Sequence, residues 1–87
     1  AADLGLAAVL VSSFLERPIS PECVFVGEIG LAGEVRRVSQ LEIRLKEAAK
    51  LGFRRAVVPA KSKLTDSAAL DIAIDPIKSV EELADKM

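Results

Sequence analysis

The chain of 87 residues has no histidine, no tryptophan and no tyrosine, and it has a single cysteine. Without histidine, these residues cannot form a Ser-His-Asp triad or a Cys-His catalytic pair. One cysteine without histidine also excludes a disulfide framework and a zinc site within the chain. Cys23 lies in the apolar run Cys23–Val26, so we interpret it as a small buried hydrophobic residue. We therefore expect no metal and no cofactor in this segment, and a cytoplasmic location.

Long hydrophobic runs are also missing. The longest apolar stretch, from Leu4 to Leu15, has about a dozen residues, against the roughly 20 that a membrane span requires. Asp3 precedes it without a basic leader, so we expect a core helix and no membrane partner. The chain starts at Ala1 without methionine, in the middle of a pattern. We therefore expect residues 1–87 to be the C-terminal portion of an N-terminally truncated domain.

Aliphatic residues, in contrast, are abundant. Hydrophobic residues make up 51% of the chain, and Phe14, Phe25 and Phe53 are its only aromatics, which suits one aliphatic core and one domain. A domain below about 100 residues buries a modest fraction of its surface, so stabilisation by further chain or by partner subunits is expected. Homo-oligomerisation is the corresponding prediction.

Charges are segregated along the chain. The formal net charge of −1 predicts no overall affinity for nucleic acid. From Glu34 to Lys63, however, there are nine basic residues and three acidic ones, and from Asp66 to Met87 there are two basic residues and six acidic ones. The middle of the chain is therefore basic and its tail acidic.

The first part of the chain is predicted to form a helix and two strands. Apolar and small residues recur at intervals of three and four residues from Asp3 to Glu16, which indicates a helix ended by Arg17-Pro18. Cys23–Ile29 has the length and β-branched content of a buried strand, and Glu34–Val38 is expected to pair back with it. Turns are marked by Gly27, Gly30 and Gly33.

The central segment has helix signals at both ends. Ser39-Gln40-Leu41-Glu42 is a capping box, in which the serine accepts from the backbone and the glutamate reaches back to the cap. It predicts a helix from Ser39 to about Leu51, closed by Gly52. Ile43 lies off the apolar face and is a candidate interface residue. That face comprises Leu41, Leu45, Ala48 and Ala49.

The last part of the chain completes an α/β pattern. A strand is predicted at Arg54–Val58, closed by Pro59, then a loop over 60–69 and a strand at Leu70–Ile74 that ends at Asp75-Pro76. Ser79–Glu82 repeats the capping box and opens a helix through Lys86. The order predicts an α/β fold, with two main helices packed on a small mixed sheet and a short C-terminal helix.

The glycine-rich stretch Gly27–Gly33 is not a phosphate loop. It lacks the Gly-x-x-x-x-Gly-Lys-Ser/Thr order, and no helix begins directly after it. We interpret it as a turn between strands. Ser-Lys chemistry remains open, since a desolvated lysine can serve as the base for a serine.

Several runs together resemble a known family. Gly27-Glu28-Ile29 with Leu31, Gly33 and Val35, a capped helix, and then Leu51–Pro59 are similar to the proteolytic domain of the Lon family. Val9–Ser12 and Arg17-Pro18-Ile19 match its preceding helix and turn. The resemblance covers nearly the whole chain, and it implies an α+β sandwich of the Lon proteolytic-domain type.

The catalytic dyad that the resemblance implies is missing. Counting from Gly33 to Gly52 places Glu42 where the family has its lysine, and aligning Val9–Ser12 places Ala1 where it has its serine. Lys46 lies one helical turn beyond Glu42, a shift of about 5 Å that exceeds hydrogen-bond reach. No catalytic residue is therefore expected, and Ala1 and Glu42 are degenerate protease positions.

The run from Gly33 to Phe53 resembles one particular family with a Lon-like domain. It is similar to the C-terminal Lon-like domain of the RadA family of bacterial DNA repair proteins, also called Sms, with Val38-Ser39-Gln40 where Lon has Ile-Gly-Gly. Arg37 departs from the proline expected there. The resemblance implies a parent protein with a zinc element and a RecA-like, DNA-dependent ATPase core. ATP, magnesium and zinc would belong to those parts, in a hexameric branch-migration helicase of homologous recombination with a possible recombinase partner.

Three functions remain open at this point: a DNA-binding, ring-forming scaffold, a fragment of an active ATP-dependent Ser-Lys protease, and an interaction module of another Lon-like family. DNA as a partner is supported by candidate phosphate contacts at Arg36, Arg37, Arg44, Lys46, Lys50, Arg54, Arg55, Lys61 and Lys63. The alternative is that Glu42–Lys46 and Arg44–Glu47 are ordinary helix pairs and that the rest is a solvated surface.

Overall fold

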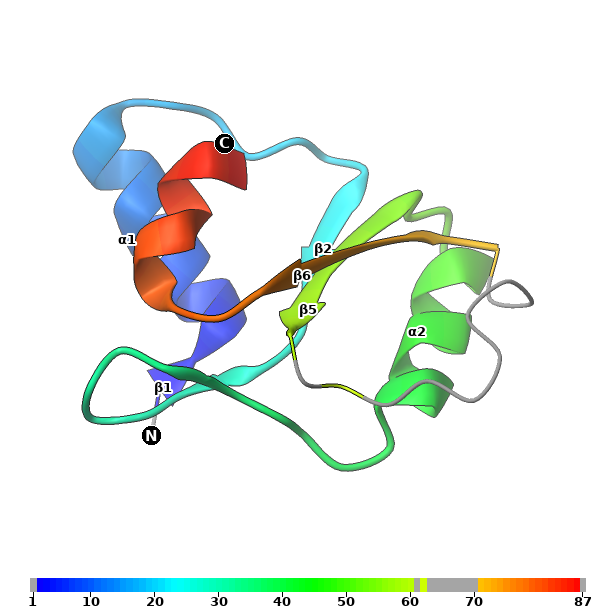
Figure 1. The fold of residues 1–87 in the computed structure, drawn as a ribbon. Helices are drawn as coiled ribbons and strands as arrows, with labels where there is room; N and C mark the ends of the chain where they lie inside the picture. The colour runs from blue at the N-terminus through cyan, green and yellow to red at the C-terminus, as the bar shows by residue number, and fades with distance from the viewer. Residues whose placement is uncertain (1, 61, 63–70, 87) are drawn as a thin grey trace.

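A computed structural model describes residues 2–60, 62 and 71–86 of the chain (Figure 1). The predicted α/β class is confirmed. The elements in chain order are β1 (Ala2–Asp3), α1 (Leu4–Leu15), β2 (Cys23–Phe25), β3 (Glu28–Ile29), β4 (Val35–Arg36), α2 (Leu41–Lys50), β5 (Arg55–Pro59), β6 (Ala73–Ile77) and the 3₁₀ helix η2 (Val80–Lys86). Within this described part, no helix is long and apolar enough to cross a membrane.

The strands form two small sheets. One is parallel, in the order β2-β5-β6, with Phe25 opposite Val57 and Val57 opposite Asp75. The other is antiparallel, in the order β1-β3-β4, with Ile29 opposite Val35. The mixture of parallel and antiparallel pairing that the sequence predicts is therefore divided between two sheets.

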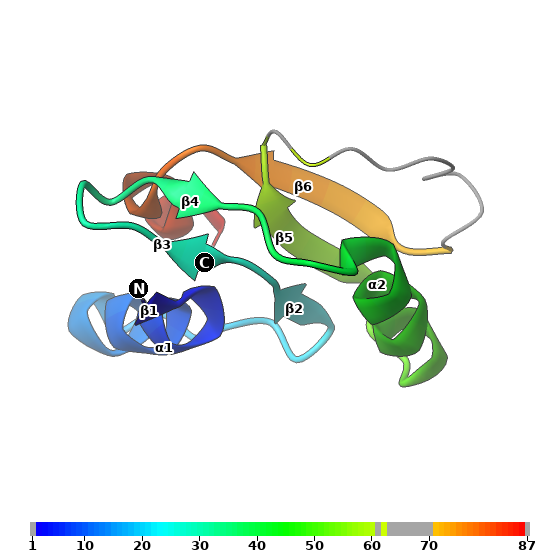
Figure 2. The same cartoon turned by 90° about the horizontal axis from the view of Figure 1, so that it is seen from below.

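The central strand β5 separates two hydrophobic clusters. Ala56 and Val58 pack with Leu45 of α2, whereas Val57 packs with Leu4 of α1 and Leu83 of η2. Successive side chains of a strand point to opposite faces, so α2 covers one face of the parallel sheet and α1 with η2 covers the other. Figures 1 and 2 show this arrangement, with α1 and η2 together on the side away from α2.

The helix α1 confirms its sequence signals. Asp3 is the N-cap, and its Oδ1 accepts hydrogen bonds from the amides of Gly5 at 2.7 Å and Leu6 at 3.3 Å. The helix ends at Glu16, which adopts a left-handed conformation with φ 54°. The predicted span Asp3–Glu16 thus includes both caps.

The predicted strand Cys23–Ile29 is wrong in one respect, because it is two strands in two different sheets. Val26 still donates to the Val57 carbonyl of the parallel sheet at 3.0 Å, but Gly27 accepts from the Leu4 amide at 3.0 Å instead. A Cβ at Gly27 would lie 3.3 Å from side-chain atoms of Leu4, Pro59 and Val35. The chain crosses between the sheets at this crowded point, which favours glycine.

The start of α2 differs from its prediction. The N-cap is Gln40, in a left-handed conformation with φ 57° and ψ 36°, and no side chain caps the helix. The first helical turn instead begins with a bond from the Arg44 amide to the Gln40 carbonyl at 3.1 Å. Ser39 precedes the N-cap by one residue, so the predicted capping box at Ser39 is wrong.

The end of α2 agrees with its prediction. Gly52 has φ +100°, and its amide donates to the Ala49 carbonyl at 3.1 Å. The Phe53 amide donates to the Ala48 carbonyl at the same distance. This pair of bonds is a Schellman motif, which needs a left-handed residue and so favours glycine.

The strand β6 extends through a proline that was predicted to end it. The Ala73 amide donates to the Arg54 carbonyl at 2.9 Å, and the Ile77 carbonyl accepts from Ala60 at 2.8 Å. Successive residues of a strand direct their backbone groups to opposite sides. Ala73 and Ile77 direct theirs toward β5, so Pro76 faces the outer side of this edge strand, where its lack of an N–H group costs no hydrogen bond of the sheet. The predicted strand Leu70–Ile74 is therefore displaced; its first residue and most of the loop over 60–69 lie outside the described residues.

The C-terminal helix keeps half of its predicted capping box. Glu82 Oε2 accepts from the amides of Lys78 at 2.5 Å and Ser79 at 2.9 Å. These backbone hydrogen bonds, that from Lys78 first, lower the pKa of the Glu82 carboxyl. The element is a 3₁₀ helix of seven residues.

Candidate functional site

The predicted phosphate contacts come from three parts of the fold. Arg36 and Arg37 lie at and after β4, Arg54 and Arg55 lie at the start of β5, and the remaining three are on α2: Arg44, Lys46 and Lys50. All seven are exposed. Lys61 and Lys63, the other two predicted contacts, lie outside the described residues.

Arg55 is held by an internal ion pair. Its Nη2 lies 2.6 Å from Asp75 Oδ2, and Lys86 Nζ lies 2.8 Å from Asp75 Oδ1. Burial acts to raise the pKa of Asp75, but the hydrogen bonds from Lys86 and Arg55 and their charges hold this pKa below its ordinary value. Asp75 therefore joins β5, β6 and η2. Arg55 lies on the face of the sheet that α1 and η2 cover, apart from the basic side chains of α2.

Two other arginines make loose surface pairs. Arg36 Nη2 lies 3.7 Å from Glu34 Oε2, and Arg54 Nε lies 3.8 Å from Glu22 Oε1, with all four side chains more than 40% exposed. Such pairs contribute about 0–1 kcal/mol and are screened by salt. They leave both guanidinium groups accessible to a phosphate.

The basic residues beside and along α2 make no such pairs. Among the described residues, no ion pair within 4.0 Å involves Arg37, Arg44, Lys46 or Lys50. The predicted helix pair Arg44–Glu47 is thus not formed. These four side chains, which we call the α2 basic row, are available to an external anion, as are Arg17 and Lys78 elsewhere in the described part of the chain.

Two cavities adjoin the α2 basic row. One, of about 500 Å³, lies at the start of α2 and is lined by Arg37, Gln40, Glu42 and Ser62, among others. Glu42, which the resemblance to Lon places at the lysine position, is half-buried there. Ala1, which the same resemblance places at the serine position, lies outside the described residues.

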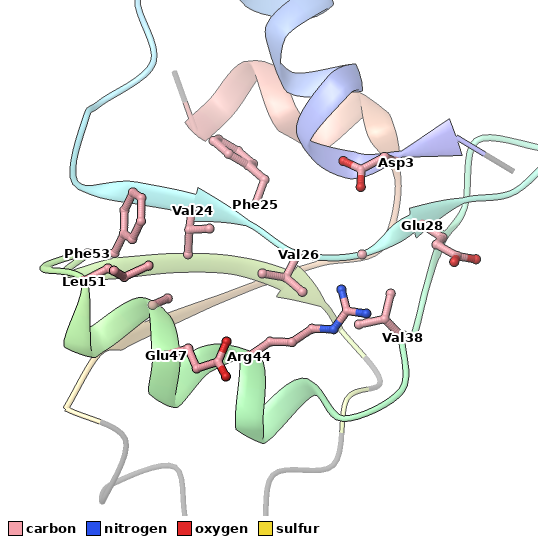
Figure 3. Close-up of a pocket in the computed structure, with 12 residues that line it drawn as sticks. Asp3, Val24, Phe25, Val26, Glu28, Val38, Arg44, Glu47, Leu51 and Phe53 are labelled. Atoms are coloured by element: carbon pink, nitrogen blue, oxygen red, sulfur yellow. The ribbon is translucent and has the colours of Figure 1, made fainter.

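The second cavity is a cleft of about 300 Å³ between α2, the edge strand β2 and the start of α1 (Figure 3). Val24, Val26 and Phe53 line its apolar part. Arg44 reaches across the cleft toward Val38, as Figure 3 shows, and Glu47 lies beside it on the same helix. The cleft combines apolar surface with a charged rim, and none of the described residues that line it is a histidine, cysteine or serine.

Other groups with potential chemistry are engaged or shielded. The Ser12 hydroxyl donates to the Arg17 carbonyl at the end of α1. Burial raises the pKa of the Cys23 thiol, with a smaller opposing effect from Arg55, so the nucleophilic thiolate is disfavoured. Within the described part of the chain, no three histidine, cysteine, aspartate or glutamate residues are grouped to hold a metal ion.

Sequence reasoning did not find the cleft or the Asp75 contact. Both depend on the register of the parallel sheet, which places Asp75 beside β5 and Val24 beside Ala56. The dipeptide Asp75-Pro76 instead predicted the end of a strand at this point, because such dipeptides commonly mark turns. No local signal in the sequence identifies either feature.

Comparison with known proteins defines the class of this chain. The matching family model is described as subunit ChlI of Mg-chelatase, and it matches residues 1–62. The match covers more than half of the chain, so the chain belongs to this family.

The individual proteins to which this chain is similar share the name DNA repair protein RadA. The chain is similar to DNA repair protein RadA from Synechocystis (53% identical, 83% of this chain and 14% of the relative) and from Bacillus subtilis (55% identical, 69% and 13%). RadA of Streptococcus pneumoniae is 39% identical over 100% of this chain and 21% of its own length. The resemblance to RadA is thus confirmed, and the chain spans only a small part of these relatives.

Proposed function

We propose that this chain is a non-proteolytic, Lon-like segment of a DNA repair protein that contributes DNA contacts and supports assembly of the protein into a ring. The shared name of its relatives, DNA repair protein RadA, supports a role in repair. The whole protein would be a DNA-dependent ATPase in homologous recombination, hexameric and acting with a recombinase. ATP, magnesium and zinc would bind outside these residues.

The observation that carries DNA binding is the α2 basic row. Arg37, Arg44, Lys46 and Lys50 are exposed and unpaired among the described residues. Lys46 and Lys50 lie one turn apart on one face of α2, whereas Arg44 lies on another face, beside the cleft. Lysine and arginine side chains that neutralise phosphates release counterions, which gives affinity without sequence preference. Arg55 contributes less, because Asp75 already binds its guanidinium group.

The proposed DNA contact is tested by charge reversal in the full-length protein. We expect Arg37→Glu with Lys46→Glu to weaken binding of a fluorescent DNA at least about tenfold at low salt, measured by anisotropy. Because the variant neutralises fewer phosphates, the slope of log affinity against log salt should fall by roughly 0.7 to 0.9 for each phosphate that it no longer neutralises.

The matched control is Arg17→Glu with Lys78→Glu, which reverses the same number of charges at two exposed residues outside α2. It changes the net charge equally without touching the α2 basic row, so affinity should change little. Equal reductions of affinity in the two variants would indicate a general charge effect. Unchanged affinity of the Arg37→Glu, Lys46→Glu variant at low salt would remove the α2 basic row from the interface.

A further inference from the structure

The helix α1 carries most of the exposed apolar surface in the described part of the chain. Eight large hydrophobic side chains are exposed there, and five of them belong to α1: Leu6, Val9, Leu10, Phe14 and Leu15. The helix has no charged residue along its length. A helix that is apolar on most of its sides is normally buried on more than one side, so we expect another element to pack on this surface.

Part of this surface is hollowed into a groove, which we call the α1–η2 groove. It encloses about 510 Å³ between Leu10, Val11, Phe14 and Leu15 of α1 and Val80, Glu81 and Ala84 of η2. Residues four positions apart on a helix share a face, so Leu10 and Phe14 present a row of apolar side chains along it. A groove of this kind suits an amphipathic helix, whose apolar side chains recur at intervals of three and four residues.

The charges at the α1–η2 groove favour an apolar occupant over a strongly charged one. Among the described residues that line it, Glu81 is the single charged one. The exposed charges beside the lining residues have both signs: Glu16 and Arg17 follow α1, and Lys78 and Asp85 flank the η2 residues. The contacting face of the occupant is therefore apolar, with one polar or basic group opposite Glu81.

The lengths of the relatives indicate where such an occupant comes from. The matched part is 14% of the Synechocystis protein and 21% of the Streptococcus pneumoniae protein, so most of each relative lies outside it. An element on the same polypeptide has an effective concentration in the millimolar range when its linker is short. It therefore occupies an apolar groove ahead of a separate protein that is present at a lower concentration.

We propose that a helix of the same polypeptide, from outside residues 1–87, packs its apolar face into the α1–η2 groove. It buries Leu10 and Phe14, which the described residues leave 62% and 87% exposed. The groove is then one side of an intramolecular interface, and the stability of α1 depends on the rest of the protein. The inference concerns the longer protein that the relatives indicate, and it does not depend on DNA binding by the α2 basic row.

Photo-crosslinking in the full-length protein tests this contact. Phe14 is replaced by p-benzoylphenylalanine, which keeps the aromatic ring, and the purified protein is irradiated. We expect a product that keeps the monomer mass on a denaturing gel, because the crosslink joins two parts of one chain. Mass spectrometry should map it to a peptide outside residues 1–87. The matched control places the crosslinker at Leu51, which is 79% exposed at the end of α2, and should give far less of this product.

Other outcomes of the crosslinking would overturn the proposal. A product of doubled mass would show that a second copy fills the α1–η2 groove. Crosslinks confined to residues 1–87, the absence of any crosslink, or equal yields from positions 14 and 51 would show that no helix of the remaining chain packs there.

Hydrogen exchange of the α1 amides in the full-length protein measures the strength of the contact. Phe14→Asp should speed this exchange about 10- to 100-fold, the effect of leaving one phenylalanine unburied, whereas Phe14→Leu should change it little. Ser13→Asp adds the same charge to the same turn but is not among the described residues that line the groove, so its effect should be clearly smaller. Equal effects of the two aspartate variants would count against the proposal. DNA affinity of the α2 variants is a separate readout, so failure of either proposal is distinguishable.

Discussion

At the residue scale, Asp75 is the charged group with the best-defined role. It accepts from Arg55 at 2.6 Å and from Lys86 at 2.8 Å, and its side chain is only 21% exposed. Hydrogen bonds to charged donors are stronger than neutral ones, and removing one partner leaves the others without their counter-charge. Asp75 thus ties η2 to the parallel sheet.

This role predicts a pH dependence of stability. The folded-state pKa of Asp75 lies below its ordinary value of 3.8, so the stabilisation is present above that pH and is lost as the pH falls through the folded-state pKa. Asp75→Asn should lower the free energy of unfolding by about 1–3 kcal/mol at pH 7. The difference from the unmodified chain should shrink below about pH 4. Urea denaturation across pH measures both, with exposed Asp85→Asn as the control.

At the scale of elements, α2 combines a buried face with an exposed one. Leu45 is fully buried against Ala56, Val58 and Ile72, whereas Ile43 of the same helix is 53% exposed. The spacing in the sequence predicted both positions correctly. It also predicted the end of the helix at Gly52 but not its start, because the left-handed turn at Gln40 depends on how the preceding loop reaches the sheet.

Substitutions on the buried and the exposed face of α2 should lower the free energy of unfolding by different amounts. Leu45→Ala should lower the free energy of unfolding by about 2–5 kcal/mol, since it removes transfer energy and leaves a cavity. Ile43→Ala should change it by about 0.5 kcal/mol or less. The urea midpoint measures both, and equal effects would show that the exposed face of α2 is covered by another part of the protein.

At the scale of the whole molecule, the resemblance to Lon predicts that the catalytic dyad is missing. Glu42, which this resemblance aligns with the lysine, lies in the first turn of α2, and Lys46 is exposed one turn further along. Glu42 has no amine, so a Ser-Lys pair cannot form at this position. Among the described residues, the cleft beside α2 is lined by no serine or cysteine. The cavity that includes Glu42 is also lined by Ser62, whose hydroxyl donates to the Pro59 carbonyl at 2.7 Å.

Peptidase activity is therefore expected to be absent. The full-length protein should not hydrolyse casein or a fluorogenic peptide above background, with or without ATP. Lys46→Ala is the informative variant, because hydrolysis that depends on Lys46 would revive the interpretation as a Ser-Lys protease. Hydrolysis unaffected by Lys46→Ala would point to a contaminating enzyme.

The sequence by itself determined the approximate extent of the three helices and the C-terminal cap at Gly52, because the apolar spacing and the capping glycine act over a few neighbouring positions. The composition also predicted an aliphatic core. The tertiary structure alone decided the crossing at Gly27, the extension of β6 through Pro76, the Asp75 contact and the groove lined by α1 and η2. These features depend on which distant segments become neighbours, and strand register and helix packing set that through the burial of the whole core.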